Sequence, residues 1–154
     1  MISIDFTPRA EDISWDSLEG SGKTLQELTA DDFTFRYFMA DATIHDHEKG
    51  RILLVTPGLP VIDFVMMLVQ MKRETLTMGR STVETSQTQD SIHAVRQDDT
   101  VRLDYSFSEI VSHVPLGFFK EIPGVALRAA LQVMYSRHGD LRFNHYLNSL
   151  SGVV

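Results

Sequence analysis

The segment that most constrains the fold is the apolar stretch of residues 61–71, in which only Asp63 and Gln70 are polar. Its apolar side chains recur at helical spacing and also fill part of the opposite face, so a helix here must be covered on most sides. We therefore predict a central helix from about Pro60 to Leu76, lying across a sheet. The stretch is about half the roughly 20 residues that a membrane-spanning helix needs, so we predict no membrane segment.

Alternating apolar and polar residues before this helix predict antiparallel strands. Residues 2–7 form the first strand. Residues 8–29 then read as a loop with one short helical turn that pins Trp15 onto the core. Residues 33–44 read as one long strand whose apolar face changes near Met39, as a bulge would produce. After a polar turn, the apolar residues 51–55 return as a strand in the interior of the sheet, which completes a hairpin.

Three more strands are predicted after the helix, over residues 82–88, 91–96 and 101–107. The first two are mostly polar, which is typical of strands at an exposed sheet edge or of strands that carry a binding surface. Residues 110–122 are ambiguous, because Pro115 and Gly117 favour a connection while residues 117–120 suit a short strand.

Two helices are predicted near the C-terminus. One covers residues 125–138 and ends at Gly139, which suits the left-handed position after a last turn. The other follows Asp140, which can cap it. The whole chain, residues 1–154, is then one α+β domain: a mostly antiparallel sheet of about five to six strands, packed by the central apolar helix and the two C-terminal helices.

Composition excludes several classes of function. The chain has 21 acidic residues against 14 lysines and arginines, a formal net charge of -7 that would repel a phosphate backbone, so we predict no nucleic-acid binding. It has no cysteine, and therefore no disulfide, thiolate metal site or cysteine nucleophile. The first residues lack the basic start and apolar core of a signal peptide, from which we expect a cytoplasmic protein.

Motifs that indicate chemistry are few. Residues 20–24, Gly-Ser-Gly-Lys-Thr, match the end of a phosphate-binding loop but lack its first glycine and the strand before it, so we interpret them as a surface turn. His45 and His47, with Asp41 or Glu48, have the ligand types of an open metal site, although the same sequence is typical of a polar turn, which we favour. Adjacent carboxylates and scattered serines show no catalytic spacing. We predict no catalytic residue, no metal site and no cofactor, and we favour a binding protein over an enzyme.

Acidic side chains gather at the predicted turns of the sheet, and this distribution is the main functional signal. If these turns meet on one side, their carboxylates and the aromatic rings nearby form a surface suited to a basic protein. The alternative is that the charge only keeps the protein soluble. The predicted partner-binding residues are Asp41, Asp46, Glu48, Asp98, Asp99, Asp104 and Tyr105.

The layout resembles the small acidic immunity proteins of bacterial toxin systems. The resemblance lies in a cysteine-free domain, a sheet with hairpins, late helices and an apolar central helix after the turn Pro57-Gly58-Leu59-Pro60. It implies noncatalytic, stoichiometric blocking of a basic toxin, with acidic side chains that mimic or occlude the toxin's substrate. It assigns no role to individual residues.

Two other functions stay open. One is a small-molecule binder or enzyme with a pocket between the sheet and the central helix, lined by Phe35, Arg36, Tyr37 and Tyr105, since such pockets are mostly apolar with a few polar anchors. The other is a homodimer in which the polar edge strand, residues 82–88, pairs across a twofold axis.

Overall fold

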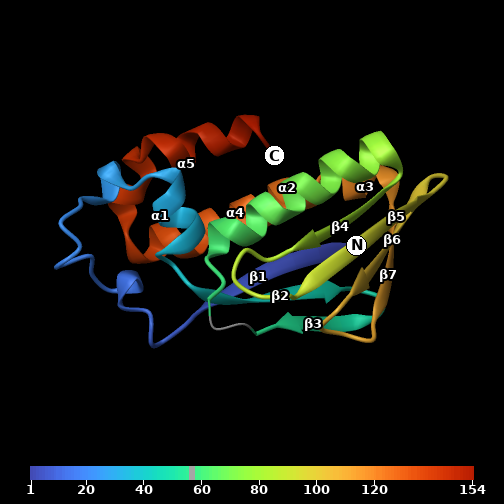
Figure 1. Ribbon diagram of the computed structural model, residues 1–154, viewed down its shortest axis with the longest axis horizontal. Coiled ribbons are helices and arrows are strands. Elements are labelled where there is room, and N and C mark those ends of the chain that lie inside the picture. Colours follow the sequence, from blue (N-terminus) through green and yellow to red (C-terminus); the bar gives the residue numbers. More distant parts are fainter. Residues whose placement is uncertain (56–57) are drawn as a thin grey trace.

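The computed structural model describes residues 1–55 and 58–154 (Figure 1). Thr56 and Pro57 lie outside the described residues, and with them the first part of the turn on which the family resemblance partly rests. The elements, in chain order, are β1 (Ile2–Pro8), η1 (Ile13–Trp15), η2 (Leu25–Glu27), α1 (Ala30–Phe35), β2 (Ala40–Asp46), β3 (Gly50–Leu54), α2 (Val61–Met78), β4 (Arg80–Glu84), β5 (Ser91–Gln97), β6 (Thr100–Tyr105), β7 (Val111–Pro115), α3 (Leu116–Phe119), α4 (Ile122–Arg137), η3 (Gly139–Phe143), α5 (His145–Ser149) and η4 (Leu150–Gly152).

The α+β class is confirmed, but the strands form two sheets rather than one. Within the described residues, one antiparallel sheet has the order β1-β2-β3 and the other the order β4-β5-β6-β7. The ambiguous stretch 110–122 contributes both β7 and α3. The short strand considered at residues 117–120 is wrong, because Gly117, Phe118 and Phe119 lie in α3 and the strand of this stretch, β7, precedes them. Each sheet joins strands that are successive in sequence. β2 and β3, and the four strands of the second sheet, are joined by short turns as hairpins, whereas residues 9–39 with η1, η2 and α1 connect β1 to β2.

The first sheet has one buried face. Ile4, Ile44 and Ile52 lie opposite one another across its three strands, and each is almost completely buried. The interior position predicted for residues 51–55 is wrong, because β3 is an edge strand that turns alternate side chains outward. Leu53 is 43% exposed and Val55 is 55% exposed.

The predicted long strand over residues 33–44 is also wrong in its first half. Thr29 starts α1 instead, because its hydroxyl accepts from the backbone N–H of Asp32 while the Asp32 carboxylate accepts from the N–H of Thr29. The chain then turns at Phe38, which has a left-handed φ of 62°, and enters β2. The change of phase read from the sequence therefore marks the end of a helix, not a bulge.

The central helix is confirmed as α2, which is packed against β4 and α4 (Figure 1). It ends at Gly79, whose φ of 79° is left-handed. The left-handed position predicted for Gly139 is wrong, because Gly139 has no positive φ and α4 ends at His138, whose φ is -138° and ψ 88°. The C-terminal helices are α4 and α5, and the cap of α5 is Asn144 rather than Asp140.

No helix in residues 1–55 or 58–154 is both long enough and apolar enough to cross a membrane.

Candidate functional site

Asp46, one of the predicted partner-binding residues, is buried in the turn between β2 and β3. Its carboxylate accepts from the backbone N–H groups of Glu48 and Lys49, at 2.9 and 3.0 Å. Burial works against its charge, but these bonds and one from the Ser112 hydroxyl hold the pKa of Asp46 below its ordinary value. At 7% exposure, the side chain serves the turn and offers little surface to a partner.

Tyr105 is buried in the same region, on β6. Its hydroxyl donates to Ser112 Oγ at 3.0 Å, and burial raises its pKa to about 12. Ser112 thus links Tyr105 in the second sheet to Asp46 in the first. Tyr105, 6% exposed, is not part of an exposed aromatic rim.

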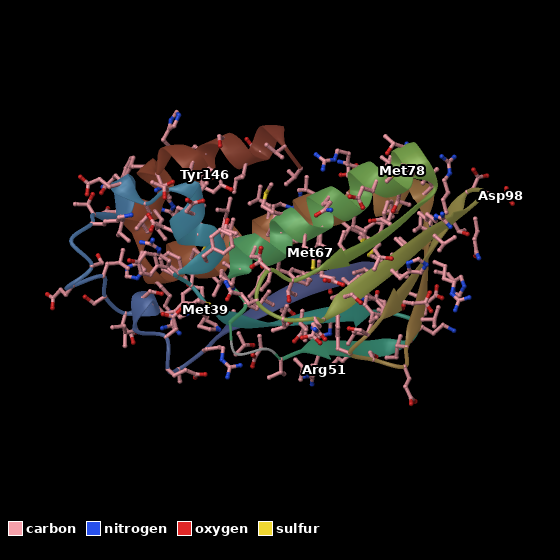
Figure 2. The ribbon with its side chains drawn as sticks, in the orientation of Figure 1. Met39, Arg51, Met67, Met78, Asp98 and Tyr146 are labelled. Carbon is pink, nitrogen blue, oxygen red and sulfur yellow. The ribbon has the colours of Figure 1, made fainter. Side chains whose placement is uncertain are left out.

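The other predicted acidic residues lie at the surface but do not meet. Asp41 forms an ion pair with Arg9 at 2.7 Å, and Asp104 one with Arg102 at 2.9 Å. Asp98 and Asp99 are exposed in the turn between β5 and β6, at the far end of the molecule from Tyr146 (Figure 2).

The length of β6 separates the two acidic turns. Asp99 precedes its first residue and Tyr105, which lies near Asp46, is its last, so six steps of about 3.3 Å place Asp99 and Tyr105 roughly 20 Å apart. The single acidic rim expected from the sequence therefore does not form. Whether any of these residues binds a partner stays a prediction.

The histidines considered as metal ligands have other partners. His45 Nε2 lies 2.9 Å from the Asp5 carboxylate, and His47 Nε2 lies 3.3 Å from Ser3 Oγ. In the part of the chain that the structure describes, no three histidine or acidic side chains come together in a way that could hold a metal ion.

The pocket expected between the sheet and the central helix is filled by core side chains. Tyr105 does border an internal cavity there, together with apolar side chains from both sheets and α2, but its volume is only about 10 Å³. That is the space of about one water molecule. Arg36 and Tyr37 line a different pocket, and Phe35 is 51% exposed on α1, so the four predicted residues do not share one site.

A different acidic surface lies in residues 9–36, a segment that contains η1, η2 and α1 and occupies one end of the molecule (Figure 1). This segment has seven carboxylates against three basic side chains, and so carries four of the seven net negative charges. We call its exposed carboxylates the acidic end: Glu11, Asp16, Glu19, Glu27 and Asp31.

The three basic side chains of the segment are held by carboxylates. Arg9 contacts Glu11 and Asp41, each at 2.7 Å. Lys23 donates to the buried Asp32 at 2.7 Å, and Arg36 lies 3.7 Å from the same carboxyl. Arg9 therefore neutralises Glu11, whereas Lys23 and Arg36 are directed to Asp32. The other outer carboxylates are not paired with a basic group of the segment, and the local potential is negative.

An open pocket of about 390 Å³ lies within this acidic surface. Ile13, Leu18 and Tyr37 give it apolar walls, and Glu19 and Arg36 give it charge. Ile13 is 72% exposed, so the pocket opens beside a free apolar side chain. Apolar contact area beside unneutralised acid is the composition expected of a surface that docks a basic partner.

The loop that carries this pocket is firmly attached to the rest of the fold. The Asp12 carboxylate accepts from the Ser14 hydroxyl and from the backbone N–H of Met39, both at 2.7 Å. The Trp15 indole N–H donates to the carbonyl of Met39, and His138 Nε2 lies 2.7 Å from the carbonyl of Ser14. The pocket is thus preformed, which lowers the entropy cost of binding.

The sequence does not reveal this surface, because residues 8–29 lack hydrophobic periodicity and predict only a loop with one short helical turn. That turn is present as η1, and Trp15 is buried as expected. The charge of the segment was a usable signal, since its excess of acid can be counted directly.

Comparison with protein-family models, curated proteins and solved structures gives no significant match. A function for this chain therefore has to be argued from the site.

Proposed function

We propose that the chain is a noncatalytic protein-binding domain that docks a basic partner on its acidic end. The observation that carries this proposal is the pocket beside Ile13, in which apolar walls adjoin exposed acid. Exposed charge alone fits any soluble protein, whereas apolar walls and exposed acid in one preformed pocket supply both contact area and charge for a partner.

The pocket suits a lysine or arginine side chain of the partner. The alkyl stem would lie against Leu18 and Tyr37, and the cationic head would reach Glu19. Arg36 also lines the pocket, but its guanidinium is directed to the Asp32 carboxyl, and this reduces its repulsion of an incoming cation. Asp16, which is exposed and only loosely paired with Arg137 at 3.6 Å, adds negative charge to the segment.

The resemblance to immunity proteins gives this proposal a specific form. In that form the partner is a basic toxin, the complex is one to one, and binding blocks the toxin without any chemistry by this chain. The negative field of the acidic end would then raise the rate of encounter, and the exposed apolar side chains would slow dissociation.

The test is calorimetric titration of this protein with the inactivated product of the gene adjacent to its own. We expect a one-to-one complex that weakens between about 50 and about 200 mM salt, because exposed charges are screened over a shorter distance at the higher salt. In the variant Asp16→Lys/Glu19→Lys, two attractions become repulsions and the dissociation constant rises about tenfold or more. The matched control is Asp98→Lys/Asp99→Lys, which changes the net charge equally at the other end and leaves affinity within about twofold.

Each other result contradicts part of the proposal. No binding to the adjacent product contradicts the immunity form. Binding that is lost in Asp98→Lys/Asp99→Lys and kept in Asp16→Lys/Glu19→Lys moves the site to the β5–β6 turn. Binding that is insensitive to salt and to both double variants means that charge does not select the partner.

A further inference from the structure

The free edge of β4 is a second surface of this molecule without a partner. β4 is the terminal strand of its sheet, and its five residues pair with β5 in unbroken register. Edge strands of monomeric proteins are commonly protected by prolines or bulges. β1 and β7, two other terminal strands, each end in a proline, whereas β4 contains neither a proline nor a glycine.

The backbone groups that face this edge follow from the hydrogen bonds around β4. Arg96 donates its N–H to the carbonyl of Gly79, and Thr85 donates to that of Asp90. Because bonding alternates along an antiparallel strand, residues 81 and 83 also bond to β5, and residues 80, 82 and 84 direct both N–H and C=O away from it. Among the described residues, these outward groups have no hydrogen-bond partner.

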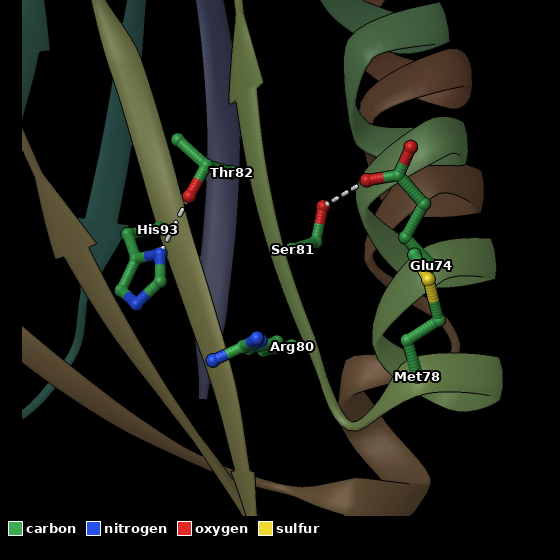
Figure 3. Close-up of a pocket in the computed structure, with 6 residues that line it drawn as sticks. All are labelled: Glu74, Met78, Arg80, Ser81, Thr82 and His93. Atoms are coloured by element: carbon green, nitrogen blue, oxygen red, sulfur yellow. Dashed lines mark hydrogen bonds between the residues drawn. The ribbon is translucent and has the colours of Figure 1, made fainter.

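A pocket of about 520 Å³ lies beside this edge and is lined by Arg80, Ser81 and Thr82, so this part of the edge is open to solvent (Figure 3). On one side of β4 the Ser81 hydroxyl donates to the Glu74 carboxylate of α2, and on the other Thr82 Oγ1 lies 2.7 Å from His93 Nδ1 of β5. Met78, 66% exposed, lies at the end of α2 beside the same edge.

We propose that this edge binds β4 of a second copy of this chain, antiparallel, about a twofold axis at Thr82. The residues with outward backbone groups then lie opposite one another, and the pairing forms about six backbone hydrogen bonds. Two four-stranded sheets become one continuous sheet. The chain that follows Glu84 in the second copy passes the exposed Met78 and covers it.

Charge selects this register among the alternatives. With the axis at Thr82, Arg80 lies opposite Glu84 of the second copy, and the reverse pair forms at the other end. An axis at Arg80 would place two arginines opposite each other, and an axis at Glu84 two glutamates, which is unfavourable for directly opposed side chains. Arg80 and Glu84 have no ion pair among the described residues of a single chain, so both are available.

The test is sedimentation equilibrium over a wide range of protein concentration. The intact chain is expected at twice its mass of 17.4 kDa. Arg80→Glu and Glu84→Arg each convert two attractive pairs into two repulsive ones and raise the dimer dissociation constant about 10- to 100-fold. The double variant Arg80→Glu/Glu84→Arg restores both pairs in reversed order and returns the constant to near that of the intact chain.

Two further variants separate pairing from folding and from general charge. Thr82→Pro removes an outward N–H that has no partner in the single chain, so the monomer should fold but not dimerise. Lys120→Glu makes the same charge change as Arg80→Glu at another exposed site and should leave the dimer intact. A mass of 17.4 kDa at all concentrations, or single variants that dimerise as the intact chain does, would overturn the proposal.

Discussion

Asn144 fastens the C-terminal helices to the segment that carries the acidic end. It is fully buried, its side-chain N–H groups donate to the carbonyls of Leu25 and Leu28 at 2.9 and 3.0 Å, and its Oδ1 accepts from the N–H of Leu147 as the cap of α5. Asn144→Ala removes a helix cap worth about 1 kcal/mol. It also leaves two carbonyls without their donor, at about 1 kcal/mol each, so the free energy of unfolding should fall by about 3 kcal/mol.

Urea unfolding measures this loss. With a slope of about 2 kcal/mol per molar urea, the midpoint should fall by about 1.5 M. Asn148→Ala is the matched control, because Asn148 is exposed and donates to one carbonyl, that of Arg142, at 2.9 Å. Its cost should stay within about 0.5 kcal/mol. A loss below about 1 kcal/mol in Asn144→Ala, or equal losses in both variants, would refute the assigned role of the buried amide.

Two other predictions concern the ion pair below the acidic end and the end of the central helix. Burial opposes the charge of Asp32, but Lys23 and Thr29 hold its pKa below the ordinary 3.8, so its stabilisation is complete above that pH and is lost as the pH falls through the folded pKa. Asp32→Asn should cost about 2 kcal/mol at neutral pH, and thermal melts should show the difference shrinking as the pH falls below 3.8. Gly79→Ala should cost about 1 kcal/mol in the same melts because of its positive φ, whereas Gly139→Ala should stay within about 0.5 kcal/mol.

The elements predicted correctly are the helix and the strand whose apolar residues follow one regular spacing along the whole element. The apolar stretch 61–71 leaves no alternative to a buried helix, and the alternation in residues 2–7 requires a half-buried strand. The α1 region fails for the opposite reason. Phe33, Phe35 and Tyr37 alternate with polar residues as they would in a strand. The helix is instead stabilised by its cap at Thr29 and by stacking of Phe33 on Tyr146, which is more than a hundred residues away in the sequence.

The candidate site, too, can be predicted from the sequence only in part. The charge of residues 9–36 can be counted from the sequence, but the burial of Asp46 and Tyr105 depends on Ser112 bringing two sheets together, which no local pattern encodes. A carboxylate in a predicted turn is equally consistent with a docking residue and with a group that accepts hydrogen bonds from the turn itself. Only the three-dimensional contact separates the two.

The two proposed surfaces lie at different ends of the central helix, and this makes them compatible. α1 packs against α2, while β4 begins just after its C-terminal end, and 18 helical residues span about 27 Å (Figure 1). A dimer paired through β4 therefore leaves both acidic ends free and presents two identical docking sites. Because the sites share no residue, Arg80→Glu should halve the number of partners bound per particle without changing the affinity of each site.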